Sequence, residues 1–428
     1  MGSMSGKVYS LDAATGCVHW RYDYRGGARA SMSIGKLASA PSGHALYLAD
    51  DRMFVRALDA GTGKELWSTQ IDDHKVGRVT GSPALHDGVL YVPLSSSEES
   101  QGNTASYQCC TFLGTVVAID ARTGKTIWKQ AVLNEKPRPT RKNSAGTQMF
   151  GPAGAAIWSA PTIDPKRGLL YVATGDSYTE IDNPASDAVV AMELKTGKIR
   201  WVNQVLANDN YVTGRINAPL GDMGPDYDFG SSPNLVKVGG KELLITGNKS
   251  AIVYAMDPDT GKTVWESAKL GSGGAGGGVQ WSTATDGKIV YAPLADNPAR
   301  GKPGVVALDA ATGKEVWRVE APRGIPCNVP SGRCAPTFSQ AVTAVPGALF
   351  AGSLDARLRA YSEADGKLLW EYDTATPVDT VNGYKQAPGG SLDMGGPVIA
   401  GGQMFIHSGY GGSAGANNLL LAFSVDGE

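Results

Sequence analysis

Short apolar stretches and short alternating stretches follow one another along this chain, separated by turns. A unit begins with a stretch such as "GVLYVPL" or "GLLYVATG", continues with an alternating stretch such as "GTVVAID", and closes with a segment that ends in tryptophan. Alternation of this kind is typical of β-strands that are covered on both faces by their neighbours. Because no helical period accompanies it, the pattern predicts an all-β protein.

The closing part of this unit recurs along the chain with closely similar letters. The copies are "LDAATGCVHW" from Leu11, "LDAGTGKELW" from Leu58, "IDARTGKTIW" from Ile119, "MELKTGKIRW" from Met192, "MDPDTGKTVW" from Met256, "LDAATGKEVW" from Leu308 and "YSEADGKLLW" from Tyr361. The shared turn is of Asp-x-x-Thr-Gly-Lys type, in which glycine supplies a positive φ and the Asp or Thr oxygen bonds local N–H groups. Four short strands per unit, repeated about eight times, predict an eight-bladed β-propeller that forms one domain over residues 1–428.

Seven of the nine tryptophans, from Trp20 to Trp370, end these copies. We expect each of them to dock between adjacent blades. An eighth copy, "LLLAFSVDGE", stops before any tryptophan, and the first copy has no apolar stretch before it. We therefore expect an incomplete first blade at the N-terminus, with strain or disorder where the ring closes.

Composition and charge argue against several classes of protein. The formal net charge is −2, whereas nucleic-acid binders usually carry a basic face. No run of about 18 apolar residues is present, so no segment is expected to span a bilayer. The opening "MGSMSGKVYS" lacks the apolar core of a signal peptide. Five histidines are scattered along the chain without a Cys/His pattern, which argues against a zinc site.

The five cysteines favour an oxidising compartment. Cys109 and Cys110 are adjacent, with neighbouring Cα atoms about 3.8 Å apart across a trans peptide, below the usual disulfide range of roughly 4.4–6.8 Å. A bond between them would make a flat, rigid, apolar plate, while two ordinary buried thiols explain the pair equally well. Cys327 and Cys334 bracket "CNVPSGRC", a loop suited to a small disulfide, and Cys17 is left over.

Trp158 and Trp281 lie outside the repeated motif. Trp158 occurs in "GAAIWSAPTID" at the start of the fourth blade, and Trp281 follows a glycine-rich stretch at the same point of the sixth. The innermost strand of a blade starts at the central channel, so two indoles there would form a platform for a flat ring. Extra core tryptophans are the alternative explanation.

Acidic residues occur at matching inner-loop positions, where an alternating strand pattern does not call for carboxylates. They are Glu98 and Glu99 in "SSSEES", Asp176 in "YVATGDSY", and Asp226 and Asp228 in "MGPDYDFGSSP". Three oxygen donors from successive blades suit a hard cation such as calcium. Each acid taken singly is also explained as a solvated loop residue.

The repeat, the adjacent cysteines and the two additional tryptophans together resemble the pyrroloquinoline quinone-dependent alcohol dehydrogenases. Within that family the likeness is greatest to the branch that acts on polyvinyl alcohol, in "YQCCTFLGTVVAIDARTGK", "IWSAPTIDPKRGLLYVATGD" and "GGGVQWSTATDGKIVYAPLAD". It extends over almost the whole chain. The resemblance implies an eight-bladed propeller with calcium and the quinone in its central channel. It also implies oxidation of secondary alcohols, polyvinyl alcohol in particular, to ketones by hydride transfer.

The resemblance implies a clamp for the quinone ring. Trp158 would stack on one face, and a Cys109–Cys110 disulfide would cover the other. In the methanol-oxidising branch the cysteine pair lies on an earlier blade, whereas here it follows the "SSSEES" loop.

Other site residues follow from the same resemblance. Glu99, Asp176 and Asp228 match the calcium ligands, with Glu98 the alternative to Glu99. Many relatives have asparagine in place of Asp176, which also supplies an oxygen. Asp228 matches the general base as well, with Asp226 the alternative. The remaining predicted cofactor contacts are Lys249 at the reactive carbonyl region, Arg29 and Arg78 at the carboxylates, and Gln280 beside Trp281 at the cofactor edge.

The family's chemistry implies further partners. Reduced quinone must pass its electrons on, so a cytochrome c acceptor is expected. Because no haem-attachment motif is present, it is expected on a separate protein or on sequence outside this chain. The periplasm is the expected location. A non-catalytic propeller scaffold for protein–protein interaction, like the outer-membrane assembly lipoproteins, is the alternative function, since those proteins share the blade motif. A third possibility is that the incomplete first blade leaves the chain unable to hold cofactor.

Overall fold

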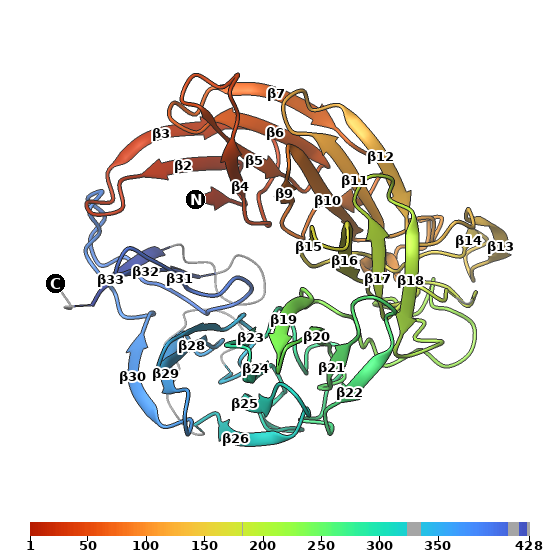
Figure 1. Ribbon diagram of the computed structural model, residues 1–428. Coiled ribbons are helices and arrows are strands. Elements are labelled where there is room, and N and C mark those ends of the chain that lie inside the picture. The colour runs from red at the N-terminus through yellow and green to blue at the C-terminus, as the bar shows by residue number, and fades with distance from the viewer. Residues whose placement is uncertain (182, 323–334, 410–418, 426–428) are drawn as a thin grey trace. The chain divides into compact units, whose positions relative to one another are not determined.

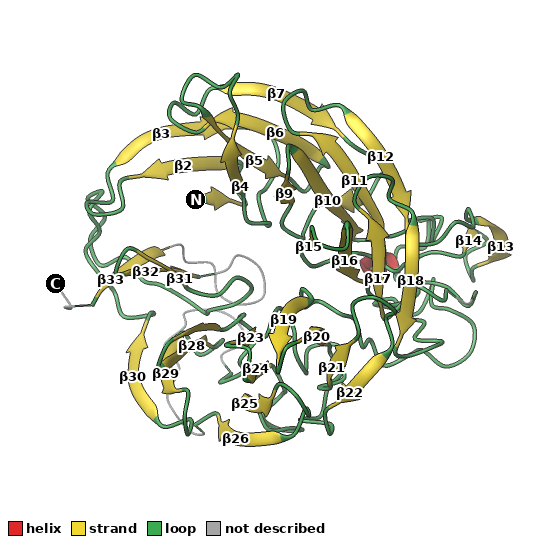
Figure 2. Cartoon of the chain, in the orientation of Figure 1, coloured by secondary structure: helices red, strands yellow, loops and turns green. Residues whose placement is uncertain are grey.

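The structure is a computed structural model that describes residues 1–181, 183–322, 335–409 and 419–425. Strands dominate it, and the only helical element among the described residues is the short 3-10 helix η1 (Glu99–Gln101) (Figure 2). The all-β prediction is therefore confirmed. The chain divides into two compact units, unit 1 (Met1–Pro233 with Asp259–Lys262) and unit 2 (Asn234–Pro258 with Thr263–Glu428).

Unit 1 contains four antiparallel sheets in chain order and one additional hairpin (Figure 1). The first sheet is β1 (Gly2–Ser3), β2 (Lys7–Leu11) and β3 (Val18–Asp23). The second is β4 (Ser33–Lys36), β5 (His44–Ala49), β6 (Phe54–Asp59) and β7 (Glu65–Gln70). The third is β8 (Gly77–Arg78), β9 (Ala84–His86), β10 (Val89–Ser96), β11 (Thr115–Asp120) and β12 (Thr126–Ala131). The fourth is β15 (Thr162–Asp164), β16 (Leu169–Ala173), β17 (Ala188–Glu193) and β18 (Ile199–Gln204), and the hairpin is β13 (Arg138–Lys142) with β14 (Gln148–Gly151).

Unit 2 continues the same plan with four more sheets. The fifth sheet is β19 (Asn234–Val238), β20 (Lys241–Gly247), β21 (Val253–Met256) and β22 (Thr263–Glu266). The sixth is β23 (Ala284–Thr285), β24 (Ile289–Leu294), β25 (Gly304–Asp309) and β26 (Glu315–Glu320). The seventh is β27 (Thr343–Val345), β28 (Ala348–Gly352), β29 (Arg357–Ser362) and β30 (Leu368–Asp373). The eighth has three strands among the described residues, β31 (Val398–Ala400), β32 (Gln403–Ser408) and β33 (Leu419–Ser424).

The strands fall where the apolar pattern predicts them. "GVLYVPL" forms most of β10, "GTVVAID" forms β11, and the segment that ends in tryptophan forms β12. The two middle strands are almost wholly buried, while β12 alternates between exposed and half-buried positions. This difference follows from their places in the sheet, because middle strands are covered on both faces and outer strands border solvent.

The recurring turn closes each hairpin as the sequence predicts. In the turn after β11, the Asp120 carboxylate accepts hydrogen bonds from the Thr123 backbone N–H and hydroxyl group, both at 2.9 Å. Gly124 follows with φ +73°, and a Cβ there would lie 2.7 Å from the indole of Trp67. Glycine is required at this position both by the backbone conformation and by the neighbouring ring.

The tryptophans of the repeat dock onto the following sheet. Several indole N–H groups donate to a backbone carbonyl there: Trp20 to Ala60, Trp67 to Ala121, Trp128 to Leu194, Trp265 to Ala310 and Trp317 to Glu363, at 2.9–3.1 Å. Gly261 lies against the Trp201 ring, as Gly124 lies against the Trp67 ring. Trp370 packs edge-on against Phe423 of β33. The predicted docking between successive sheets is confirmed.

The described part of the chain contains no helix long and apolar enough to cross a membrane.

Candidate active site

Three carboxylates from widely separated segments meet in unit 1. Glu99 begins η1, Asp176 follows β16, and Asp228 lies in the loop before β19. One oxygen of each lies within 4.8 Å of the others, and this is the only such group of potential metal ligands among the described residues. The two aspartates are buried, and Glu99 is partly exposed. The structure thus brings together the three residues that the sequence predicts as calcium ligands.

Asp176 is the unusual member of this group. Its side chain is fully buried, and neither carboxylate oxygen has a hydrogen-bond partner among the described residues. Its backbone N–H donates to Oδ1 of Asp228 at 2.6 Å. Burial, followed by the charges of Asp228 and Glu99, raises the pKa of Asp176 well above its usual value. A buried carboxylate without donors, beside two other carboxylates, fits a site that a cation completes.

Glu98 has a different role from its neighbour. Its Oε1 accepts the N–H of Thr111 at 2.7 Å and the hydroxyl of Tyr107 at 2.9 Å, and its Oε2 accepts the N–H of Phe112 at 2.7 Å. Burial raises the pKa of Glu98 although these hydrogen bonds oppose the shift. Since its oxygens hold the segment around the adjacent cysteines, Glu98 lies outside the carboxylate group and Glu99 lies within it.

Asp226 also lies outside that group, although its charge contributes to the raised pKa of Asp176. It adopts a positive φ of 58°, and its N–H donates to Oδ1 of Asp209 at 3.1 Å. The N–H of Tyr227 donates to the other oxygen of Asp209 at 2.7 Å. Asp209 therefore shapes the turn that delivers Asp228.

Cys109 and Cys110 form a disulfide with each other, as one of the two alternatives from the sequence proposes. Both are buried, at 2% and 0% exposure, within the cluster that also contains Tyr178. The Cys110 N–H donates to the Phe150 carbonyl at 3.2 Å, and the Phe150 N–H donates to the Cys109 carbonyl at 2.7 Å. Strand β14 of the hairpin thus pairs with the disulfide segment.

Of the other three cysteines, only Cys17 lies among the described residues. Cys17 is a free, exposed thiol, in agreement with its being left over. The predicted Cys327–Cys334 pair lies outside the described residues.

Trp158 lies beside the carboxylates. A Cβ at Gly175 would come within 2.8 Å of the indole nitrogen and 2.5 Å of Oδ1 of Asp228, so glycine alone leaves room for both side chains. The indole N–H is buried and has no acceptor among the described residues. The Trp158 ring also packs against the core cluster that contains Cys109 and Cys110. Indole, disulfide and carboxylates are therefore parts of one neighbourhood.

Two buried asparagines tie the loops of this neighbourhood together, and sequence reasoning missed both. The amide of Asn143, in the hairpin, donates to Oδ1 of Asn217 at 2.8 Å. Asn217 in turn donates to the carbonyl of Gln101, the last residue of η1, at 2.8 Å and to that of Thr104 at 3.0 Å. The Thr213 hydroxyl also donates to Oε1 of Glu99 at 3.2 Å. No motif marks these asparagines, because their partners are backbone carbonyls distant in sequence.

The other predicted site residues lie in two groups. Arg29 precedes β4 and Arg78 ends β8, both in unit 1. In unit 2, the Lys249 carbonyl accepts the N–H of Gly274 at 3.0 Å. The Gln280 amide donates to the Gly277 carbonyl at 2.5 Å. The turn that carries Lys249 and the glycine-rich loop that carries Gln280 and Trp281 are therefore in direct contact. The contacts of these residues with a cofactor stay predictions.

Two family profiles match the sequence. The profile described as "Glucose/ethanol/alcohol dehydrogenase, beta-propeller domain" matches residues 100–270, which include the disulfide, Trp158, Asp176 and Asp228. The profile described as "Outer membrane protein assembly factor BamB" matches residues 1–141 and 249–409, but not the segment with Trp158, Asp176 and Asp228. The second match therefore includes the repeat, Glu99 and the adjacent cysteines, whereas only the first includes Trp158 and the two aspartates.

Two proteins described as polyvinylalcohol dehydrogenase are similar to this chain over its whole length. The protein from Pseudomonas sp is 48% identical, in an alignment that covers 100% of this chain and 69% of the relative. The chain belongs to the pyrroloquinoline quinone-dependent alcohol dehydrogenase family. The relative from Sphingopyxis sp. (strain 113P3) is 42% identical, covering 100% of this chain and 68% of its own length. The predicted membership of this quinoprotein family is confirmed.

The fold agrees with that of a solved structure. The quinohemoprotein alcohol dehydrogenase from Comamonas testosteroni matches with a TM-score of 0.69 and 17% identity, over 99% of this chain and 72% of that chain. The predicted fold, an eight-bladed β-propeller, is confirmed.

Proposed function

We propose that this protein oxidises secondary alcohols, polyvinyl alcohol in particular, to ketones with calcium and pyrroloquinoline quinone. Its relatives at 42–48% identity are described as polyvinylalcohol dehydrogenases, which supports the substrate class. The observation that supports the cation is the meeting of Glu99, Asp176 and Asp228, together with the two buried oxygens of Asp176 that have no hydrogen-bond partner among the described residues. A hard cation accepts six to eight oxygens in irregular geometry, so carboxylates of this kind suit calcium.

When bound, calcium supplies a Lewis acid and the quinone supplies the acceptor for a hydride. The chain's part is to bind and orient these groups and to move a proton. Asp228 takes the proton of the alcohol hydroxyl, which is the role of a carboxylate beside a cation. The Asp176 N–H at 2.6 Å holds one oxygen of Asp228 and fixes the direction of the carboxylate. Lys249 supports negative charge that develops near the quinone carbonyls.

The disulfide and Trp158 would hold the flat ring of the quinone. Both are apolar and lack freedom of movement, because the disulfide is tied to Phe150 and the indole is packed against the same cluster. A rigid site loses little conformational entropy on binding a planar ligand. Arg29, Arg78, Gln280 and Trp281 are proposed to contact the edge and the carboxylates of the cofactor, where a guanidinium fork fits well.

The insertion at residues 129–157 is the segment proposed to control access of a polymer to the active site. Its hairpin β13–β14 is joined to the disulfide by Phe150 and to the Glu99 loop through Asn143 and Asn217. We propose that this insertion shapes the mouth of the site. Electrons leave to a cytochrome c, and the periplasm is the proposed location, where the adjacent cysteines oxidise.

The test is reconstitution of the purified protein with calcium and pyrroloquinoline quinone, followed by dye reduction with polyvinyl alcohol and with simple secondary alcohols. Activity that needs both additives and is lost in Asp228→Asn supports the proposal. Asp120→Asn is the matched control, because its carboxylate bonds the Thr123 N–H and hydroxyl in a turn of the repeat. A protein that folds but never binds quinone contradicts the proposal and favours a scaffold.

A further inference from the structure

The indole of Trp281 is held by a carboxylate that no sequence motif indicates. Its Nε1–H donates to Oδ1 of Asp393 at 2.8 Å, across 112 residues of sequence. The same oxygen accepts the Ser339 hydroxyl at 2.6 Å and the Met394 N–H at 2.8 Å. Hydrogen bonds to an ionised acceptor are stronger than neutral ones. Three donors that converge on one oxygen fix the carboxylate and, through it, the plane of the indole.

The segment that carries Asp393 is fixed on both sides. The Ala341 N–H donates to the Met394 carbonyl, and the Gln340 amide donates to the Gly395 carbonyl, both at 2.8 Å. Before Asp393, the Leu392 N–H donates to the Ser353 carbonyl at 3.1 Å. Asp393 is therefore a fixed point and not the tip of a loose loop.

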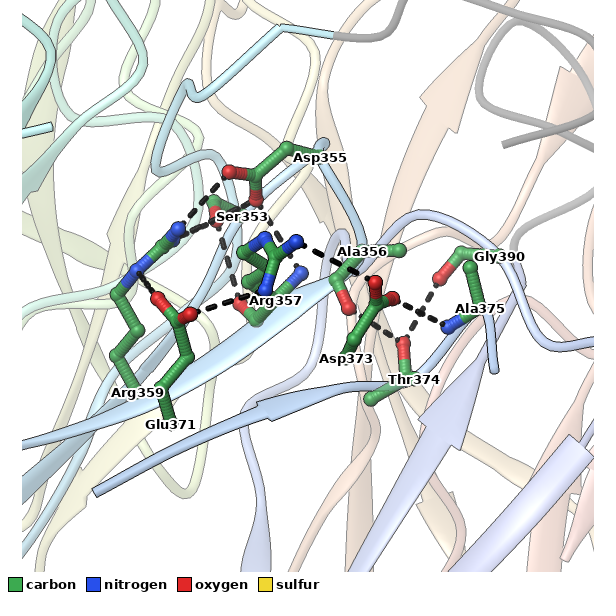
Figure 3. Close-up of polar contacts among 10 residues, drawn as sticks. All are labelled: Ser353, Asp355, Ala356, Arg357, Arg359, Glu371, Asp373, Thr374, Ala375 and Gly390. Carbon is green, nitrogen blue, oxygen red and sulfur yellow. Dashed lines mark hydrogen bonds and ion pairs between the residues drawn. The ribbon is translucent and has the colours of Figure 1, made fainter. Parts of the chain in front are cut away.

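A buried ion network surrounds Ser353, whose carbonyl accepts the Leu392 N–H (Figure 3 shows the network). Arg359 is 0% exposed and donates to Oδ2 of Asp355 at 2.9 Å and to Oε2 of Glu371 at 2.7 Å. It also donates to the Ser353 hydroxyl at 2.7 Å, so the network holds the turn whose carbonyl receives the Leu392 N–H. Breaking a buried pair of this kind leaves an uncompensated charge, which keeps such a network in place.

The backbone of Trp281 is fixed independently by another carboxylate. Asp296 is fully buried and accepts the N–H groups of Ser272, Gly273 and Gly278 at 2.5, 3.2 and 3.0 Å. These bonds fold the glycine-rich loop that leads into Trp281. Asp296 thus fixes the backbone position from which the Trp281 side chain extends, whereas Asp393 fixes the orientation of the indole ring.

We infer that Asp393 is a positioning residue that orients the Trp281 indole for contact with the edge of the quinone. The inference rests on the proposed function for the identity of the ligand. Without the bond to Asp393 the ring can turn about its two side-chain dihedrals, and ordering it costs binding free energy. Asp393 itself acts on the cofactor only through the indole.

The first test needs no cofactor. In a ¹⁵N-indole spectrum of the protein, with its nine tryptophans, Trp281→Phe identifies the Trp281 resonance by its disappearance. Asp393→Ala should shift that resonance and leave the other resonances in place, and Asp393→Asn, which keeps an acceptor oxygen, should shift it less. Asp309→Ala is the matched control, because Asp309 accepts the Ala311 N–H and the Thr312 hydroxyl in a turn of the same unit. An unmoved Trp281 resonance in Asp393→Ala overturns the inference.

The second test measures the dissociation constant of pyrroloquinoline quinone in the presence of calcium. Asp393→Ala should weaken binding roughly tenfold, which corresponds to about 1.4 kcal/mol, and Asp393→Asn should restore most of it. In a Trp281→Phe background the same substitution should have little further effect, since Asp393 acts through the indole N–H.

The outcomes separate the two proposals. Equal weakening in both backgrounds shows that Asp393 is merely structural, and the inference fails while the proposed function stands. If the wild-type protein binds no quinone, the proposed function fails, and the role of Asp393 toward a cofactor fails with it. The indole spectrum then still reports whether Asp393 fixes the ring.

Discussion

Replacing Asp176 by asparagine should stabilise the protein without calcium and weaken its response to calcium. Asp176 is fully buried, its oxygens have no hydrogen-bond partner among the described residues, and Glu99 and Asp228 lie within 4.8 Å. At an effective dielectric constant of about 20, two unit charges at that distance repel by about 3.5 kcal/mol. Asparagine has almost the same shape and removes Asp176's share of this repulsion.

The measurable gain is smaller than the full repulsion. The raised pKa of Asp176 means that proton uptake already relieves part of it, and Glu99 is partly solvated. We expect Asp176→Asn to add about 2 kcal/mol to the free energy of unfolding in a chelating buffer. For a unit of this size, that raises Tm by roughly 4–8 °C. Differential scanning calorimetry measures the shift.

With calcium bound, the wild-type protein should be more stable than Asp176→Asn, the reverse of their order in chelator. At a concentration of about one hundred times Kd, a bound ion stabilises the wild-type protein by about 2.7 kcal/mol. The variant should gain much less, because it has lost one of three anionic ligands. The matched control is Asp296→Asn: Asp296 is equally buried but accepts three backbone N–H groups. Its replacement should destabilise the protein with and without calcium.

Two results would refute this reasoning. An Asp176→Asn variant that is less stable than wild type in chelator would mean that the carboxylate has a structural partner. A variant with the full calcium response would mean that the negative charge of Asp176 does not contribute to binding the ion.

Three further predictions concern the site and its framework. Asp228→Asn should abolish dye-linked turnover yet retain quinone binding, as a binding titration and an activity assay on the same sample will show; loss of both would contradict a role as base. Replacing Cys109 and Cys110 together by serine should weaken quinone binding at least tenfold with an intact fold by circular dichroism, and unchanged affinity would exclude the clamp. Trp128→Leu should lower the free energy of unfolding by about 2–4 kcal/mol in a urea titration. It leaves a cavity at the contact with the next sheet and removes the hydrogen bond to the Leu194 carbonyl. A loss under 1 kcal/mol would contradict the docking role.

The fold could be read from the sequence because its determinants are local and repeated. A turn such as Asp120 to Gly124 contains its own hydrogen bonds and its own positive φ. The tryptophan that follows each turn packs on the next copy of the same turn, so one motif specifies both the strand pairing and the contact between sheets. Because the motif is repeated about eight times, the predicted fold does not depend on the sequence of any single copy.

The residues of the candidate active site could be predicted only in part from the sequence. Glu99, Asp176 and Asp228 stand out because carboxylates interrupt an apolar pattern, yet the sequence left Glu98 and Asp226 as alternatives. What separates Glu98 from Glu99 is a set of backbone donors thirteen and fourteen residues away, at Thr111 and Phe112. Such contacts depend on how loops cross in space.

The supporting residues could not be predicted at all. Asn217 bonds carbonyls 116 and 113 residues away, and Asp393 receives an indole from 112 residues away. Neither the composition nor the spacing of a single sequence encodes such pairs, since any asparagine or aspartate in a loop is equally plausible beforehand.

The measurement that tests the account most directly is the affinity for pyrroloquinoline quinone with and without calcium, followed by absorbance, in the wild-type protein and in Asp176→Asn. The account predicts stoichiometric binding that requires calcium in the wild-type protein and a much weaker calcium dependence in the variant. Binding of equal strength in chelator, or a calcium requirement that Asp176→Asn leaves unchanged, would contradict the claim that the negative charge of these carboxylates holds the cation beside the quinone.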